Sequence, residues 1–156
     1  MKALVAILWS PGKYIIMVKR MRSGVHQISP CVIIVDDDVD AADLYGIWLR
    51  EAGHRVSIVS DAQRALILAP ILRPSVVVTD IGLPGIDGIE LVSRLRQLTE
   101  LEDCRYVAVT AYKEASLAGR CRAAGFSDFL EKPFSAPTLI NGVFAAARAG
   151  SRASDR

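Results

Sequence analysis

Short apolar runs recur at nearly regular intervals along residues 32–130. There are five runs of four or five residues, four of them containing Val or Ile and the fifth containing Phe and Leu, and longer mixed stretches separate them. The run at residues 32–35 is continuously apolar, which is typical of a strand buried on both faces of a parallel sheet. The sequence therefore predicts strands at residues 32–35, 55–59, 75–79, 106–109 and 126–130.

The stretches that follow these runs have helical periodicity. Their apolar residues recur three or four positions apart, which places them on one side of a helix. Predicted helices occupy residues 40–52, a segment starting at 60, a segment spanning 91–98, residues 114–124 and residues 138–147. Gly53 and Gly125 follow the first and fourth helices as stops.

Particular residues set the faces and ends of the first two helices. The residues expected to face inward in the first helix are Ala41, Leu44, Trp48 and Ala52. Ser60 and Gln63 have the spacing of a capping box and predict the start of the second helix. Pro70 is expected to kink that helix or to end it early, because proline removes a backbone hydrogen bond.

Five strand–helix units with short connections predict an α/β fold, in which a five-stranded parallel sheet carries helices on both faces. In such sheets, ligands bind beyond the carboxyl ends of the strands. The apolar runs are far shorter than the roughly 18 residues that a membrane-spanning helix needs. We therefore expect a soluble protein with no membrane partner.

Charge divides the chain into two parts. Residues 1–29 carry five basic residues and no acidic ones, whereas residues 30–156 carry 14 basic and 17 acidic residues. We expect residues 1–29 to be an extension outside the domain, residues 30–148 to be the domain and residues 149–156 to be a short tail. The acidic surplus of the domain argues against direct DNA binding. Three cysteines without metal-ligand spacing, and no convincing signal peptide, indicate the cytoplasm.

Polar residues with phosphoryl-transfer chemistry follow four of the predicted strands. Asp36 and Asp37 end the first strand, Asp80 the third and Thr110 the fourth, and Lys132 lies just past the fifth. Because the strands are parallel, these side chains are expected at one edge of the sheet. Clustered carboxylates need a compensating cation, and a set of oxygen ligands without His or Cys favours Mg²⁺.

Four segments together resemble the receiver domain of two-component response regulators. They are residues 32–38, 76–88, 107–111 and 129–134, and they occur in the order typical of that family. The resemblance covers residues 30–148 and implies a flavodoxin-like (βα)5 fold. It also implies a phosphoprotein that catalyses its own phosphorylation and dephosphorylation, and so is not an enzyme in the usual sense.

The resemblance assigns the acceptor and the metal ligands. Asp80 would be the nucleophile that accepts a phosphoryl group. Asp37 would bind Mg²⁺ directly, Asp36 directly or through a water, and Gly82 through its backbone carbonyl.

The resemblance also assigns the groups around the phosphoryl oxygens. Thr110 would hydrogen-bond one oxygen, Lys132 would pair with another, and backbone N–H groups near Ile81 and Ala111 would complete the site. Phe129 matches the aromatic switch residue that turns inward when Thr110 moves, although an aromatic at a strand position is as readily explained by packing. The peptide bond before Pro133 is commonly cis in this family.

The family also implies partners. The phosphoryl donor would be a histidine kinase or a histidine phosphotransfer protein. An unidentified protein effector would read the state of the domain at the face formed by the fourth helix, fifth strand and fifth helix. Only a short tail follows the last predicted helix, with too few residues to fold, so we expect a stand-alone receiver.

Two other functions remain open from the sequence. A phosphorylation-independent binding module would have the same fold, although such modules usually lose one of the acidic, threonine or lysine positions retained here. A Mg²⁺-dependent phosphohydrolase with a D-x-D-x-[TV] motif is less favoured, because Asp40 stands where Thr or Val is required. Finally, Tyr112 and Gly82 are expected to set how easily water reaches the aspartyl phosphate.

Overall fold

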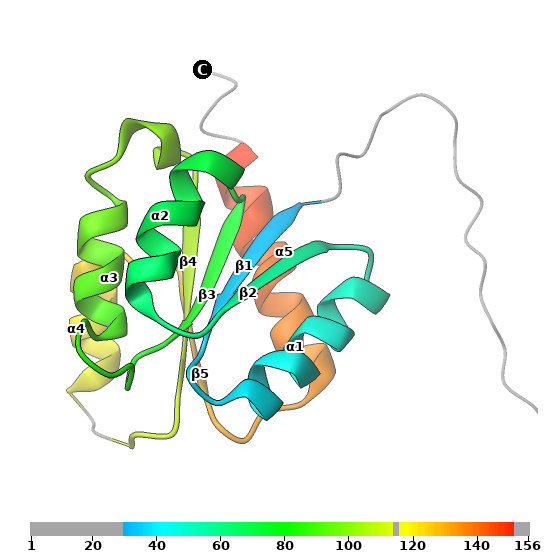
Figure 1. Ribbon diagram of the computed structural model, residues 1–156. Helices are drawn as coiled ribbons and strands as arrows, with labels where there is room; N and C mark the ends of the chain where they lie inside the picture. The colour runs from blue at the N-terminus through cyan, green and yellow to red at the C-terminus, as the bar shows by residue number, and fades with distance from the viewer. Residues whose placement is uncertain (1–29, 114–115, 152–156) are drawn as a thin grey trace, which may run out of the picture.

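All five predicted strands are present and form one parallel sheet. The computed structural model describes residues 30–113 and 116–151. The strands are β1 (Cys31–Val35), β2 (Arg55–Val59), β3 (Val76–Asp80), β4 (Arg105–Thr110) and β5 (Asp128–Glu131). Their order in the sheet is β2-β1-β3-β4-β5, and every neighbouring pair is parallel (Figure 1). The predicted fold class is confirmed.

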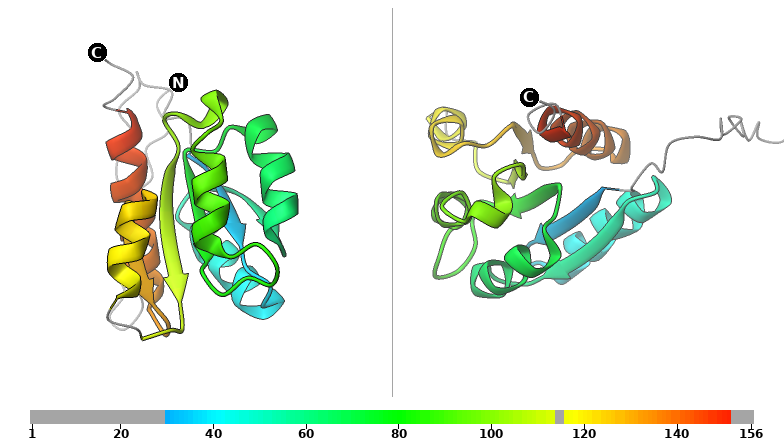
Figure 2. Two further views of the ribbon diagram at one scale, coloured as in Figure 1. Left: turned by 90° about the vertical axis from the view of Figure 1, so that its left-hand side faces the viewer. Right: turned by 90° about the horizontal axis from the view of Figure 1, so that it is seen from above.

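Helices cover both faces of the sheet. They are α1 (Val39–Glu51), α2 (Ala62–Leu72), α3 (Gly88–Leu95), α4 (Leu117–Ala124) and α5 (Ala136–Ser151), and a short 3-10 helix η1 (Thr99–Leu101) precedes β4. α1 and α5 pack on one face, and α2, α3 and α4 pack on the other (Figure 2). None of these helices is long and apolar enough to cross a membrane.

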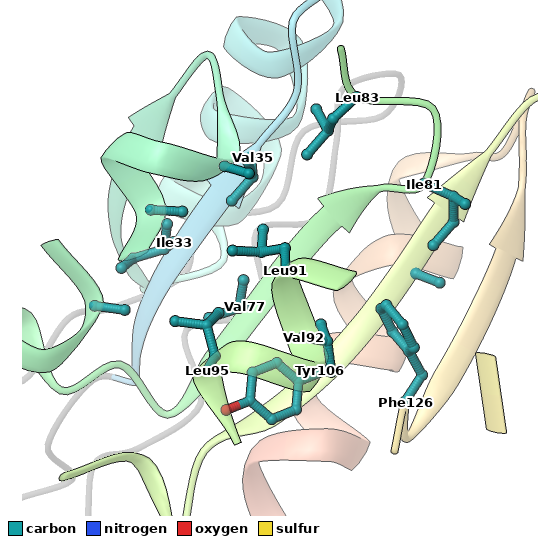
Figure 3. Close-up of a cluster of buried hydrophobic side chains, with 14 of the residues drawn as sticks. Ile33, Val35, Val77, Ile81, Leu83, Leu91, Val92, Leu95, Tyr106 and Phe126 are labelled. Carbon is teal, nitrogen blue, oxygen red and sulfur yellow. The ribbon is translucent and has the colours of Figure 1, made fainter. Parts of the chain in front are cut away.

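Two apolar layers fix the strands between the helices. Because side chains alternate along a strand, Ile33 and Val77 face α2 and α3 (Figure 3), while Val32 and Val76 face α1 and α5. All four are fully buried, and each such side chain contributes roughly 1.5–3 kcal/mol of transfer free energy. The strand ends are therefore held on a rigid frame.

The inward face of α1 differs from the prediction. The buried residues are Ala42, Tyr45, Gly46 and Leu49, whereas Leu44 is 43% exposed and Trp48 is half-buried. The helix is thus rotated by one position, or about 100°. Gly46 explains part of this rotation, because a Cβ there would lie 2.8 Å from Cδ1 of Ile58. A close approach of α1 to β2 therefore requires this glycine to face inward.

The cap expected at the start of α2 was wrong, and at its end Pro70 lies inside the helix, two residues before the last one. Asp61, and not Ser60, caps its start, where the carboxylate accepts a hydrogen bond from the Arg64 N–H at 2.8 Å. The helix continues through Pro70 to Leu72. Proline lies close to the end, and the N–H of Arg73 restores regular bonding by donating to the carbonyl of Ala69 at 2.8 Å.

The last elements are also shifted from their predicted bounds. Phe126 precedes β5, because its N–H donates to the carbonyl of Cys121 and closes the end of α4. α5 extends to Ser151, beyond the predicted end at residue 147, and Phe144 on this helix is 39% exposed. Residues 1–29, 114–115 and 152–156, including the basic extension, lie outside the described residues.

Candidate phosphoacceptor site

The strand register brings the predicted site residues to one edge of the sheet. Val35 on β1 pairs with Thr79 on β3, so Asp36 and Asp80 each follow a residue of that pair. In the same way, Thr110 at the end of β4 pairs with Glu131 at the end of β5, so Lys132 follows β5 at the same edge. This edge lies at the bottom of Figure 1, at the carboxyl ends of the strands.

Lys132 joins the two acidic strand ends. Its Nζ lies 2.8 Å from Oδ2 of Asp36 and 2.8 Å from Oδ2 of Asp80. The side chain of Asp36 is fully buried, and those of Asp80 and Lys132 are 15% and 18% exposed. Removing one member of such a group leaves a buried charge without compensation, so its members depend on one another.

Backbone N–H groups hold the second oxygen of each carboxylate. Oδ1 of Asp36 accepts from the N–H of Asp38 at 3.0 Å, and Oδ1 of Asp80 accepts from the N–H of Gly82 at 2.9 Å. Asp38 itself caps α1 through the N–H of Ala41, as expected of an acidic residue at a helix start. The orientation of both carboxylates is therefore fixed from two sides.

Burial and pairing shift the ionisation of the group. Burial raises the pKa of the Asp36 carboxyl, and the hydrogen bonds from Lys132 and the Asp38 N–H oppose this rise. Burial lowers the pKa of the Lys132 ammonium, but the hydrogen bonds and charges of Asp36 and Asp80 outweigh burial and raise it above its ordinary value. Lys132 therefore stays charged at neutral pH.

The acidic residues fit a divalent cation. One carboxylate oxygen from each of Asp36, Asp37 and Asp80 lies within 4.8 Å of the others. Three carboxylates beside one ammonium leave a net charge of minus two, which a divalent ion would neutralise. Oxygen ligands of this kind, with Asp37 exposed to solvent, suit Mg²⁺, which keeps several of its waters.

Thr110 ends β4, and Tyr112 follows it beside the segment after Asp80. The Thr110 side chain is buried, and its Oγ1 accepts a hydrogen bond from the N–H of Tyr112 at 3.1 Å. The Tyr112 ring is 57% exposed and lies against Gly82, where an added Cβ would be 2.9 Å from Cε2 of the ring. The ring therefore lies directly over the residue two positions after Asp80.

The structure bears on three expectations for the surroundings of Asp80. The N–H of Ile81 donates to the carbonyl of Val109 at 3.1 Å, so it is part of the sheet and is not free for a phosphoryl oxygen. Phe129 is half-buried and packs against the apolar layer under α2, α3 and α4. The peptide bond between Lys132 and Pro133 is cis, as the resemblance implied.

Sequence reasoning missed Tyr45. The ring is buried, and Nζ of Lys132 lies 5.9 Å from its centroid. The misplaced inward face of α1 hid this contact, because Leu44 and Trp48 were expected to face the sheet instead. A signal was present in the spacing, since Ala42, Tyr45 and Leu49 also recur three and four positions apart.

Comparison with known proteins tests this interpretation. A sequence model of the response regulator receiver domain matches residues 32–144. The chain belongs to this family. The match confirms the resemblance that the sequence indicated. Receiver domains are signalling phosphoacceptors that bind Mg²⁺ in an acidic pocket and interact with histidine kinases and downstream effectors.

Individual relatives agree with the family assignment. A putative response regulator from Chloroflexus aurantiacus has a solved structure with a TM-score of 0.73 and 31% identity, covering 77% of this chain and 98% of that one. An uncharacterized 14.6 kDa protein of Leptolyngbya boryana is 35% identical over 70% of this chain and 83% of its own length.

Other relatives are longer proteins. The transcriptional regulatory protein FixJ of Bradyrhizobium diazoefficiens is 35% identical over 66% of this chain, but the match spans only 49% of FixJ. The similarity to this relative is therefore a similarity of receiver domains.

Proposed function

We propose that this receiver domain accepts a phosphoryl group on Asp80, in a Mg²⁺-dependent reaction, from a histidine kinase or a histidine phosphotransfer protein. The single observation that carries the proposal is the bridge from Lys132 to Asp36 and Asp80, with both Nζ–Oδ2 distances at 2.8 Å. A structural salt bridge needs only one carboxylate. A lysine held between the proposed nucleophile and a proposed metal ligand is placed to pair with an oxygen of the transferring phosphoryl group.

In the proposed reaction, a carboxylate oxygen of Asp80 forms a bond to phosphorus while the bond from phosphorus to the donor nitrogen breaks, and the imidazole leaves with that electron pair. Asp36, Asp37, Asp80 and the carbonyl of Gly82 would hold Mg²⁺, which supplies positive charge to the phosphoryl oxygens when bound. The ammonium of Lys132 pairs with another phosphoryl oxygen. The hydroxyl of Thr110 donates to a third.

The domain would transmit its state through the face formed by α4, β5 and α5. Phe129 lines a hollow of about 360 Å³ between α4 and β5, together with Ala118, Cys121 and Arg122. Movement of Thr110 toward the phosphoryl group would open space for the Phe129 ring to turn inward, and the hollow would change shape. We propose a protein effector for this face, and the acidic surplus of residues 30–156 supports protein rather than DNA as the direct partner.

Two boundaries are part of the proposal. Residues 30–148 would be the receiver domain, with residues 1–29 outside it. Because α5 continues to Ser151, the tail expected at residues 149–156 would begin only after that residue. We also propose a cytoplasmic location, because Cys31, Cys104 and Cys121 are all free thiols.

Intact-mass spectrometry after incubation with acetyl phosphate and Mg²⁺ tests the proposal. We expect the wild-type protein to gain the mass of one phosphoryl group, and Asp80→Asn or added EDTA to prevent the gain. Asp87→Asn is the matched control, because Asp87 only caps α3 through the N–H of Glu90 and should not be needed. If the folded wild-type protein gains no mass, the phosphorylation-independent binding module becomes the better interpretation.

A further inference from the structure

Tyr45 lies under the phosphoacceptor site on the inward face of α1. Its ring is only 7% exposed, and it packs against the ring of Phe134 with centroids 5.0 Å apart and against Trp48 at 5.8 Å. Aromatic pairs at these separations stabilise each other beyond the apolar area they bury. The ring is therefore fixed between α1 and the connection from β5 to α5.

The ammonium of Lys132 rests near this ring. Nζ lies 5.9 Å from the Tyr45 centroid, within the range at which an aromatic ring attracts a cation. Because the Lys132 side chain is largely buried, solvent weakens this attraction less than at an exposed site. The ring thus contacts the same charged group that bridges Asp36 and Asp80.

The lysine is held at three points. At its backbone, the N–H donates to the carbonyl of Thr110 at 2.7 Å. Two residues later, Phe134 is anchored on Tyr45, and at the end of the side chain the ammonium meets the Tyr45 ring. Tyr45 therefore supports both the segment that carries Lys132 and its reactive end.

An uncharged ring is well suited to hold the ammonium of Lys132, because this ammonium must move from a carboxylate to the phosphoryl oxygens. An incoming phosphoryl group brings negative oxygens to Asp80, and the ammonium must then leave a carboxylate and pair with them. A carboxylate support would compete for the ammonium. An aromatic ring attracts the ammonium without carrying a formal charge. The Tyr45 ring belongs to α1 and so lies outside β4 and β5, the strands that carry Thr110 and lead to Lys132.

We propose that Tyr45 is a positioning residue, which acts through Lys132 to hold the ammonium where it meets the phosphoryl group. This role deepens the proposed function and rests on it. The ring carries the effect, and the hydroxyl does not, so Phe should substitute for Tyr and an aliphatic residue should not.

A double-mutant cycle between Tyr45 and Lys132 tests the proposal. The measured quantity is the affinity of the Mg²⁺-loaded protein for beryllofluoride, a mimic of the phosphoryl group, followed by fluorine NMR. We expect Tyr45→Leu to weaken binding about tenfold, and Tyr45→Phe to restore it. In the Lys132→Met background, Tyr45→Leu should change the affinity less than about twofold, because the group through which Tyr45 acts is missing.

The controls separate positioning from packing. Tyr106→Leu removes a buried aromatic ring at the start of β4, on the other face of the sheet, and should leave the affinity unchanged. If Tyr45→Leu does not fold, Phe134→Leu loosens the same support and should weaken binding in the same direction. A loss of equal size with and without Lys132, or no loss at all, would overturn the inference.

The two proposals fail differently. A wild-type protein that takes up neither phosphoryl group nor beryllofluoride contradicts the proposed function, and the role of Tyr45 falls with it. A wild-type protein that takes up both, beside a Tyr45→Leu variant of equal affinity, contradicts only the role of Tyr45.

Discussion

The two edges of the sheet differ, because one carries a hollow and the other carries a cluster of charged side chains. The amino-terminal edge has a hollow of about 570 Å³, which is lined by residues around Pro74, Glu102 and Gly150. At the carboxyl-terminal edge, Lys132 lies 2.8 Å from both Asp36 and Asp80. The site is therefore marked by charged groups that converge on one point, and the size of a hollow is a poor guide to it.

Each edge also has a buried titratable residue, and the two residues differ in their hydrogen-bond partners. Asp36 is fully buried, and Lys132 and the N–H of Asp38 bind its two oxygens. His54 at the start of β2 is 5% exposed, and neither ring nitrogen has a hydrogen-bond partner among the described residues. Its ring instead packs on Phe144 with centroids 4.7 Å apart. We interpret the first residue as part of a site and the second as part of the core.

Removing Lys132 should have the largest effect, because the carboxyl-terminal edge then loses its fixed positive charge. We expect Lys132→Met to lower the rate of phosphorylation by acetyl phosphate about 100-fold or more. Affinity for Mg²⁺ should rise at the same time, because the ammonium no longer competes for the oxygens of Asp36 and Asp80. Time-resolved intact-mass measurement and a Mg²⁺ titration check the two effects.

Lys113→Met is the control for this prediction. Lys113 is also paired, with Glu131 at 3.2 Å, but its side chain is 75% exposed. Exposed pairs contribute little, so both quantities should stay at the wild-type values. Phosphorylation of Lys132→Met at the wild-type rate would mean that the charged cluster at the carboxyl-terminal edge is not needed for the reaction, and the contrast between the two edges would not mark the site.

Tyr112 offers a second, smaller test at the carboxyl-terminal edge. Its ring lies against Gly82, two residues after Asp80. We predict that the ring shields the aspartyl phosphate from water on that side. We expect Tyr112→Ala to raise the rate of aspartyl phosphate hydrolysis about fivefold, while Tyr112→Phe keeps the ring and the wild-type rate. Loss of the phosphoryl mass with time measures this rate. An unchanged rate in the alanine variant would show that the ring does not shield the phosphate.

The sequence predicts the site better than it predicts the helices around it. Strands buried on both faces are recognisable from composition alone, and parallel strands bring Asp36, Asp80 and Lys132 to one edge whatever the helices do. The inward face of α1 depends on tertiary contacts. Gly46 must meet Ile58, and this contact cannot be read from apolar periodicity.

The position of Tyr45 was missed for that reason. Once α1 turns by one residue, Tyr45 replaces Leu44 on the inward face and meets Lys132. The start of α2 shows the same limit on a smaller scale, because Ser60 and Asp61 are both good caps by composition. Only the hydrogen bond to the N–H of Arg64 distinguishes them.

The smallest effect is expected at the amino-terminal edge, where burial lowers the pKa of His54 more than the nearby carbonyl of Pro30 raises it. Above a pH of about 6.5, His54 is neutral in both the folded and the unfolded chain. Below it, the unfolded chain binds a proton that the folded ring resists, so the free energy of unfolding falls by at most about 1.4 kcal/mol per pH unit until the pH reaches the lowered pKa.

His54→Leu should remove this part of the pH dependence. Urea denaturation at pH values of about 7.5 and about 5.5 measures the change for wild type and variant, and phosphorylation of Asp80 at neutral pH should be unaffected. The carboxylates titrate equally in both proteins, so the difference between the two profiles belongs to His54. His26→Leu, the other histidine and outside the described residues, is the control and should follow wild type. Parallel profiles for wild type and His54→Leu would mean that the buried ring accepts a proton as readily as a solvated one.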